Sequence, residues 1–140
     1  MTRFNILPKK HQKKSGSKKV YCPLEEKEQE TIAQYLDIKK FCWIHVPNGG
    51  NRDVITGAKL KRQGVKAGFP DIQIFDAPIS EGKKYRGLII ELKRREGGRL
   101  RENQKEWIEE LRARNWLCYV AHGAMDGIEF IEGLEFEGVK

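Results

Sequence analysis

Cysteine is scarce in the sequence, and its spacing argues against two common kinds of small protein. Only Cys22, Cys42 and Cys118 occur among the 140 residues, with no CxxC pair and no Cys/His cluster. A disulfide framework or a structural zinc site needs ligands that are grouped more closely. We therefore expect free thiols in a reducing compartment.

Long apolar runs are also missing. No segment approaches the roughly 20 apolar residues that are needed to cross a bilayer, and the basic N-terminus lacks the apolar stretch of a signal peptide. Apolar residues make up 39% of the chain and charged residues 34%, which is typical of a small globular domain with one core. The expectation is a protein in the cytoplasm of the cell that makes or hosts it, with no membrane partner.

Acidic residues are absent from the first 24 positions, which hold Arg3 and six lysines and so carry the whole net charge of +7. We interpret residues 1–22 as a disordered basic arm and residues 23–140 as the folded domain. A second basic stretch, residues 51–68, sets five cations against Asp53: Arg52, Lys59, Lys61, Arg62 and Lys66. Such patches favour a polyanion, nucleic acid above all, although a basic tail alone is as often only solubilising.

Apolar periodicity predicts a mixed α/β or α+β core. Helices are expected at residues 24–36, 101–114 and 123–131, and strands at residues 41–46, 71–75, 88–93 and 116–121. Between them we expect a loop with at most a short helix at 52–68, a turn-rich connection at 76–86 and an acidic tail after 131. The strands on either side of the 101–114 helix should be parallel, by the right-handed crossover rule.

Two of these strands place acidic side chains so that they can meet. In residues 88–93, Glu91 and Lys93 share one face because side chains alternate along a strand. In residues 71–75 the isoleucines face the core, so Asp71 lies on the opposite face and pairing of the strands would bring it beside Glu91. Two close carboxylates repel unless a cation lies between them, and hard oxygen ligands favour Mg²⁺ or Mn²⁺. An isolated Glu-x-Lys triplet is more often an ordinary exposed pair. The Pro-Asp that precedes it by one hairpin strengthens the hypothesis of a metal site.

Gln104 falls on the apolar stripe of the 101–114 helix. Because a buried amide without partners costs about 1–3 kcal/mol, we expect it to face the cleft and to bind a phosphate or a carboxylate; the alternative is a side chain that reaches solvent.

His45 has no paired ligand spacing around it, so a structural role is favoured over a phosphate contact. The tryptophans at 43, 107 and 116 lie in periodic apolar segments, which is typical of core residues rather than base-stacking platforms.

The order and spacing of these motifs resemble one family. The run GVKAGFPDI at 64–72, the run IELK at 90–93, Gly97-Gly98, Gln104 and the aromatic at 107 are similar to the virus-type replication-repair nucleases (VRR-NUC), a branch of the PD-(D/E)xK superfamily. The resemblance covers about residues 25–131. It implies a restriction-endonuclease-like core, in which helices flank a mixed central β-sheet.

The resemblance also implies a chemistry, that of a Mg²⁺- or Mn²⁺-dependent nuclease. Asp71 and Glu91 would bind the metal, with the Leu92 carbonyl as a further ligand. Lys93 would be the catalytic lysine, placed to orient or activate a water or to stabilise charge on a phosphate.

Family members carry a Glu and a Gln in the first helix, and Glu26 and Gln29 look similar. Glu26 would then support the catalytic site together with Gln104. Glu25 and Glu28 are close enough in the sequence to leave this assignment open.

For partners, the resemblance implies branched or double-stranded DNA, including Holliday junctions, and a homodimer. The setting would be replication and repair in the cytoplasm of a bacterial or phage-infected host cell. Asn48, in the turn after the first strand, would contact DNA together with Arg52, Lys59, Lys61, Arg62 and Lys66. The alternative is a non-catalytic nucleic-acid-binding module that uses the basic arm and the 52–66 patch. An RNA nuclease is a third hypothesis, but no aromatic-rich surface for single strands supports it.

Overall fold

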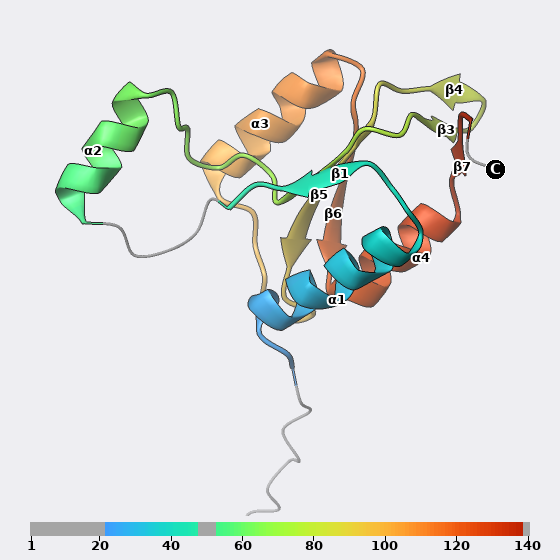
Figure 1. Cartoon of the computed structure of the whole chain (residues 1–140), viewed down its shortest axis with the longest axis horizontal. Coiled ribbons are helices and arrows are strands. Elements are labelled where there is room, and N and C mark those ends of the chain that lie inside the picture. The colour runs from blue at the N-terminus through green and yellow to red at the C-terminus, as the bar shows by residue number, and fades with distance from the viewer. Residues whose placement is uncertain (1–21, 48–52, 139–140) are drawn as a thin grey trace, which may run out of the picture.

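A computed structural model describes residues 22–47 and 53–138, and its helices and strands alternate along the chain (Figure 1). The elements are α1 (Glu25–Ile38), β1 (Trp43–His45), α2 (Val54–Arg62), β2 (Ile72–Ile74), β3 (Pro78–Ser80), β4 (Lys83–Lys84), β5 (Leu88–Lys93), α3 (Glu102–Ala113), β6 (Leu117–His122), α4 (Ala124–Glu132) and β7 (Glu135–Phe136). This is the mixed α/β class that the periodicity predicted.

A four-stranded sheet in the order β1-β2-β5-β6 forms the centre. β1 and β2 are antiparallel, as are β2 and β5, whereas β5 and β6 are parallel. The parallel pair flanks α3, so the crossover prediction is confirmed. All six residues of β5 are buried. Its four apolar side chains pack toward α1 and α4 on one face and toward α3 on the other, and Glu91 and Lys93 are buried charged residues.

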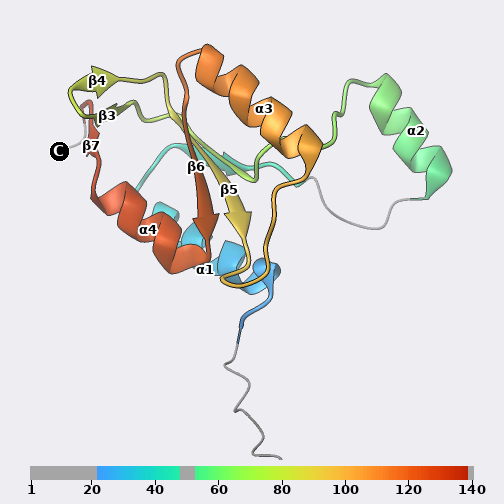
Figure 2. The ribbon, with the colours of Figure 1, turned by 180° about the vertical axis from the view of Figure 1, so that it is seen from behind.

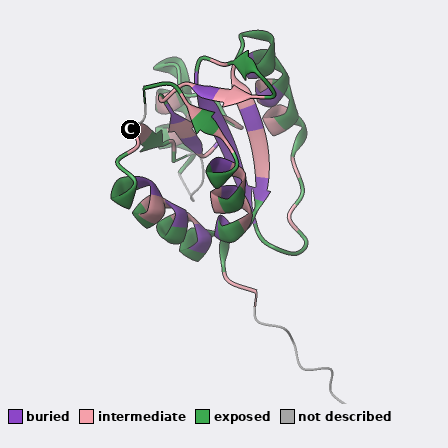
Figure 3. Cartoon of the chain, turned by 90° about the vertical axis from the view of Figure 1, so that its right-hand side faces the viewer, coloured by how far each residue is buried: buried purple, intermediate pink, exposed green. Residues whose placement is uncertain are grey.

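Two apolar clusters hold the helices to the sheet. Ile32 and Leu36 of α1 and Ile131 of α4 pack with Ile72 and Ile90 of the sheet on one face. The smaller cluster on the other face joins the sheet to α3. The turned views show the two helix layers on opposite sides of the strands, with buried residues concentrated on the strands and the inner helix faces (Figures 2 and 3).

The structure adds detail in two connections. Residues 52–68 were expected to form a loop with at most a short helix, and they contain α2, a helix of nine residues. Its start is capped by Asp53, whose Oδ1 accepts the Thr56 N–H at 2.7 Å. Residues 76–86 contain β3 and β4, and β7 from the expected acidic tail joins them in a second, three-stranded sheet. Short two- and three-residue strands give too few alternations for periodicity to detect.

The expected basic arm, residues 1–22, lies outside the described residues except for Cys22. In the described ranges 22–47 and 53–138, no helix is long and apolar enough to cross a membrane.

Candidate active site

Asp71 and Glu91 lie opposite one another where β2 and β5 separate. The two strands pair with Ile72 opposite Ile90, and continuing this register by one residue brings Asp71 opposite Glu91. Directly opposed residues of antiparallel strands share a face of the sheet. Asp71 Oδ2 accepts a hydrogen bond of 2.8 Å from the Leu92 backbone N–H, which holds the acid against β5.

Gln104 links the two charged side chains of β5. Its Nε2 donates to Glu91 Oε1 at 2.8 Å, and its Oε1 accepts from Lys93 Nζ at 2.9 Å. The same Oε1 accepts the Arg101 backbone N–H at 2.9 Å, so Gln104 also caps the start of α3. Lys93 Nζ lies 3.1 Å from Glu91 Oε1. Three side chains from two elements therefore form one closed network.

The two acids are difficult to ionise in this position. Glu91 is 2% exposed, and burial, followed by the negative charge of Asp71, raises the pKa of Glu91 to about 7. Burial also raises the pKa of Asp71, against the opposing effects of the Leu92 N–H and of the positive charges of His45 and Lys93. A carboxylate pair with raised pKa values gains stability from additional positive charge.

The donor atoms around this pair suit a hard divalent cation. Glu91 Oε2 is buried and has no hydrogen-bond partner among the residues that the structure describes. The N–H and C=O of one residue point to the same edge of a strand, so the Leu92 carbonyl faces the edge where Asp71 lies. Mg²⁺ typically takes only one or two protein carboxylates and keeps waters as its other ligands.

A larger protein ligand set is not present in the described ranges. They contain no group of three or more His, Cys, Asp or Glu side chains that could hold a metal ion. A cation at this position would therefore depend on two carboxylates, a backbone oxygen and ligands from water or substrate, which is a donor set of the Mg²⁺ type rather than the zinc type.

The first turn of α1 brings Glu25 to the site. Glu25 lines the same pocket as Asp71 and Glu91, and its pKa is raised by burial, with the charge of Lys93 as the main opposing effect. Glu26 is exposed and is not among the residues that line this pocket. The family resemblance favoured Glu26 and left Glu25 as an alternative. The structure places Glu25, and not Glu26, in the pocket.

Glu28, the third acid considered, has a structural position. It is 2% exposed, its Oε1 lies 2.8 Å from Arg95 Nε, and its Oε2 accepts the Ala124 backbone N–H. It therefore ties α1 to the start of α4 and to the chain beyond β5.

A pocket of about 390 Å³ opens over these side chains. Besides the acids, Lys93 and Gln104, its walls include three exposed arginines at 94, 99 and 101. An acidic floor below a basic rim is an arrangement that can hold a metal ion and a phosphate at once. We did not assign these arginines from the sequence; the signal is the density of arginine directly after the Glu-x-Lys motif.

His45 lies beside Asp71, which the sequence did not predict. Its Nδ1 is 2.8 Å from the Asp71 carbonyl oxygen, and the Val46 N–H donates to the same oxygen at 2.8 Å. A carbonyl oxygen only accepts, so Nδ1 must carry a proton and donate this hydrogen bond. The signal missed in the sequence is its place at the end of the strand that pairs with the Asp71 segment.

Of the predicted DNA-binding residues, the structure describes four, and these four do not line the pocket. Asn48 and Arg52 lie outside the described residues. Lys59, Lys61 and Arg62 lie in the last turn of α2, and Lys66 follows in the next loop; all four are exposed, and none lines the pocket. The helix stands apart from the sheet and its flanking helices (Figure 1).

Comparison with known proteins gives a family match and a structural match. The VRR-NUC domain family model matches residues 24–125. A solved structure described as a VRR_NUC domain protein is 30% identical, covers 81% of this chain and 88% of its own, and superposes with a TM-score of 0.67. No curated protein sequence matches the chain.

Proposed function

The chain belongs to the VRR-NUC domain family, as its motifs predicted, and from this premise we propose that it is an endonuclease that hydrolyses phosphodiester bonds in DNA with Mg²⁺ or Mn²⁺. Nucleases make up this family, so the coarse activity follows from membership. One observation supports the metal-dependent chemistry: half-buried Asp71 lies opposite buried Glu91, whose Oε2 has no hydrogen-bond partner among the described residues, and the ammonium of Lys93 lies beside Glu91.

Asp71, Glu91 and the Leu92 carbonyl would hold the metal. When bound, a divalent cation lowers the pKa of a coordinated water and neutralises charge on a phosphate oxygen. The chain's own contribution is to fix the two carboxylates, through the Leu92 N–H at Asp71 and the Gln104 amide at Glu91. Fixed acids need no reorganisation when charge develops during the reaction.

Lys93 and Gln104 act as a positioning pair. The Lys93 ammonium is held by Gln104 Oε1 and Glu91 Oε1, which leaves one of its three N–H bonds to donate to the attacking water or to a phosphate oxygen. Glu25, at the mouth of the pocket, carries the role for which we first considered Glu26: it accepts hydrogen bonds from water in the site.

Exposed cations would bind the phosphates around the cleavage site. Arg94, Arg99 and Arg101 surround the pocket and would hold the scissile strand, while Lys66 and the last turn of α2 would contact the backbone further away. The finer proposal, branched or junction DNA in phage or bacterial replication and repair, depends on the family resemblance.

Cleavage assays on matched substrates test this proposal. The wild type should cut at least one of a fork, flap, nicked, Holliday-junction or single-stranded substrate with Mg²⁺ or Mn²⁺, and EDTA should stop the reaction. Asp71→Asn, Glu91→Gln and Lys93→Ala should each reduce the rate by about 100-fold or more, with DNA binding largely retained. DNA retention with no EDTA-sensitive nicking would instead favour a non-catalytic binding module.

Glu25→Gln and Glu26→Gln form a matched pair within the same assay. Both remove one negative charge from the first turn of α1, but only Glu25 lines the pocket. We expect the Glu25 variant to lose activity about tenfold or more and the Glu26 variant to keep it. The reverse result would return the role to Glu26.

A further inference from the structure

A surface groove on α3 adjoins the candidate active site. It has a volume of about 470 Å³ and shares Ala67 and Asn103 with the active-site pocket. Its other walls are side chains of α3 and of the residue that caps its C-terminus. Small-molecule sites typically have volumes of about 300–1,000 Å³. The groove is therefore of a size that takes a nucleobase with its sugar rather than a whole helix.

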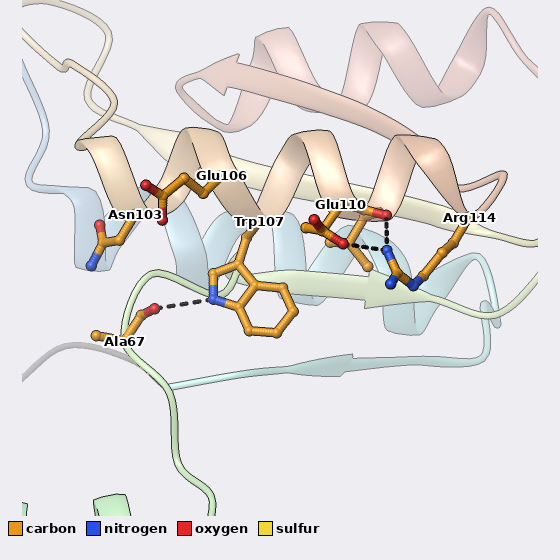
Figure 4. A pocket seen from close by; sticks show the side chains of 7 residues that line it. Ala67, Asn103, Glu106, Trp107, Glu110 and Arg114 are labelled. Atoms are coloured by element: carbon orange, nitrogen blue, oxygen red, sulfur yellow. Dashed lines mark hydrogen bonds and ion pairs between the residues drawn. The ribbon is translucent and has the colours of Figure 1, made fainter.

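Trp107 gives this groove a flat aromatic wall. Its indole is half-buried, and two contacts fix its orientation. Nε1 donates to the Ala67 carbonyl at 3.1 Å, and the Phe69 ring packs edge-to-face with a centroid distance of 5.1 Å. Figure 4 shows the indole beside α3, between Ala67 and the Glu110–Arg114 pair. A fixed aromatic ring is a common platform for an unpaired base, because every base has a π-face that can stack on it.

Asn103 adds an amide with unused hydrogen-bonding capacity. Its Oδ1 is buried and has no hydrogen-bond partner among the residues that the structure describes, and such an acceptor costs free energy until a donor meets it. Asn103 precedes Trp107 by four positions, so the two side chains lie on the same side of α3. Asparagine amides typically pair with the N6 and N7 atoms of adenine. Rotation about the Cβ–Cγ bond can turn either end of the amide toward the groove.

The charges of the groove favour a base over a phosphate. Arg114 is paired with Glu110, and the carboxylate of Glu106 leaves the groove with a net negative charge. A carboxylate repels a phosphate, but it accepts a hydrogen bond from the amino group of a base. The arginines that would hold phosphates line the adjoining active-site pocket instead: Arg94, Arg99 and Arg101.

We propose that the groove binds one unpaired nucleobase of the DNA strand whose phosphate occupies the active-site pocket. The base stacks on Trp107, and Asn103 bonds its edge, so adenine, which carries an exocyclic amino group, is the preferred base. The base must be unpaired because a base inside a duplex is already stacked on both faces. This proposal rests on the proposed function, and it narrows the substrate to DNA with an unpaired strand beside the cleaved bond, such as a flap.

A base scan with the wild-type protein tests the site without any substitution in the chain. The probe is a duplex with a single-stranded flap of abasic nucleotides, into which one adenine is placed at each position in turn, on 5′ and on 3′ flaps. Binding is measured by fluorescence anisotropy in EDTA, so that no DNA is cleaved. We expect the adenine to lower the Kd about tenfold at one position near the duplex.

Equal affinities at all flap positions would overturn the proposal. So would a failure to bind any of the flaps, because neither the stacking nor the phosphate contacts need a metal.

Substitutions then test whether the gain in affinity comes from the groove. Trp107→Leu keeps apolar bulk without an aromatic ring and should abolish the gain, whereas Trp107→Phe should keep part of it. Phe75→Ala is the matched control, because Phe75 is an exposed aromatic that lines neither the groove nor the active-site pocket; it should bind like wild type. A gain that survives Trp107→Leu would place the base elsewhere and contradict the proposal.

The contribution of Asn103 is measured with a changed base. Deoxynebularine is the purine nucleoside that lacks the amino group of deoxyadenosine. The wild type should bind the adenine flap about fivefold or more tightly than the deoxynebularine flap, and Asn103→Ala should bind the two equally. The same preference for adenine in both proteins would remove Asn103 from the site.

Binding and cleavage together separate this proposal from the proposed function. A protein that gains affinity from the adenine through Trp107 but cuts no substrate would count against the nuclease and not against the base site. A protein that cuts with Mg²⁺ but gains nothing from an adenine at any flap position would count against the base site alone.

Discussion

At the scale of single residues, the site depends on atoms with assigned donor and acceptor roles. Gln104 donates through Nε2 to Glu91 and accepts through Oε1 from Lys93 and from the Arg101 backbone. A glutamate at this position would place a third negative charge beside Glu91, and a leucine would leave the Glu91 and Lys93 groups without their partner. The amide is therefore the side chain of this length that serves both groups without adding charge.

Sequence alone predicted this neighbourhood but not all of its members. Because side chains alternate along a strand, Glu91 and Lys93 must share a face. Because Gln104 lies on the apolar stripe of its helix, it must face inward. Both placements follow from local periodicity. His45 could not be placed in this way, because its contact with Asp71 depends on which strand pairs with which. The catalytic roles of these residues stay predictions.

His45 provides a test at the residue scale. His45→Asn keeps an N–H donor near the position of Nδ1 and should therefore retain its bond to the Asp71 carbonyl, with near wild-type cleavage. His45→Gln reaches the position of Nε2 instead and should reduce cleavage about tenfold, as outer-shell substitutions at metal sites commonly do. The measurements are kcat and the metal concentration for half-maximal rate. Equal losses in the two variants would contradict a role through Nδ1.

At the scale of elements, what the sequence predicted well was the long and periodic segments. The segments 88–93, 101–114 and 116–121 each repeat their pattern often enough to reveal β5, α3 and β6, and handedness then fixes their parallel arrangement. For α2 the sequence predicted no more than a short helix within a loop, because residues 54–62 have a glycine in the middle and little apolar periodicity. Its only clear local signal was the Asp53 cap with Thr56 three residues on.

The choice among the acids of α1 shows a second limit of prediction from sequence. Successive residues of a helix point about 100° apart, so Glu25 and Glu26 face different directions once the helix is docked. The rotation of α1 is set by Ile32, Leu36 and the buried Glu28, which contact other parts of the chain. Periodicity identified the helix, but only tertiary packing could identify which acid reaches the site.

Gly68 joins two elements of the site, and its replacement tests that junction. Its φ is +85°, and a Cβ there would lie 2.9 Å from the Asn103 backbone carbon and 2.7 Å from the Asn103 Cγ. Gly68→Ala should therefore push the start of α3, and with it Gln104, away from β5. We expect the free energy of unfolding to fall by about 1–3 kcal/mol, because alanine is strained at this positive φ and its Cβ clashes with Asn103. Cleavage should also become weaker.

Gly57→Ala is the control for this measurement, because a Cβ at Gly57 meets nothing within 4 Å. In urea denaturation it should be neutral or slightly stabilising, since alanine favours a helix interior over glycine. If the Gly68 variant were as stable as wild type, the loop that precedes β2 would not be tightly coupled to α3.

At the scale of the whole molecule, the candidate site lies where both faces of the sheet meet. α1 covers one face and contributes Glu25, while α3 covers the other and contributes Gln104. The two converge beyond the strand ends, so the pocket exists only when both layers are packed. Sequence motifs indicated the strand residues of the site, but a convergence of two layers is a property of the complete fold.

The burial of Glu91 couples global stability to pH. In metal-free protein the pKa of Glu91 rises from 4.5 to about 7, so in this window the folded state binds more protons than the unfolded state. Stability is then fully present below pH 4.5 and is lost as the pH rises through 7. A shift of this size corresponds to about 3 kcal/mol as an upper bound.

Urea denaturation at pH 5.5 and pH 8 in EDTA measures this dependence. We expect the wild type to be less stable at pH 8, and Glu91→Gln, which is neutral at both values, to lose most of the difference. Mg²⁺ added at pH 8 should stabilise the wild type, because it binds the folded acid pair and not the unfolded chain, and should leave the Glu91→Gln protein nearly unchanged. If Mg²⁺ stabilised both proteins equally, the ion would be bound elsewhere and the pair Asp71 and Glu91 would not be the metal site.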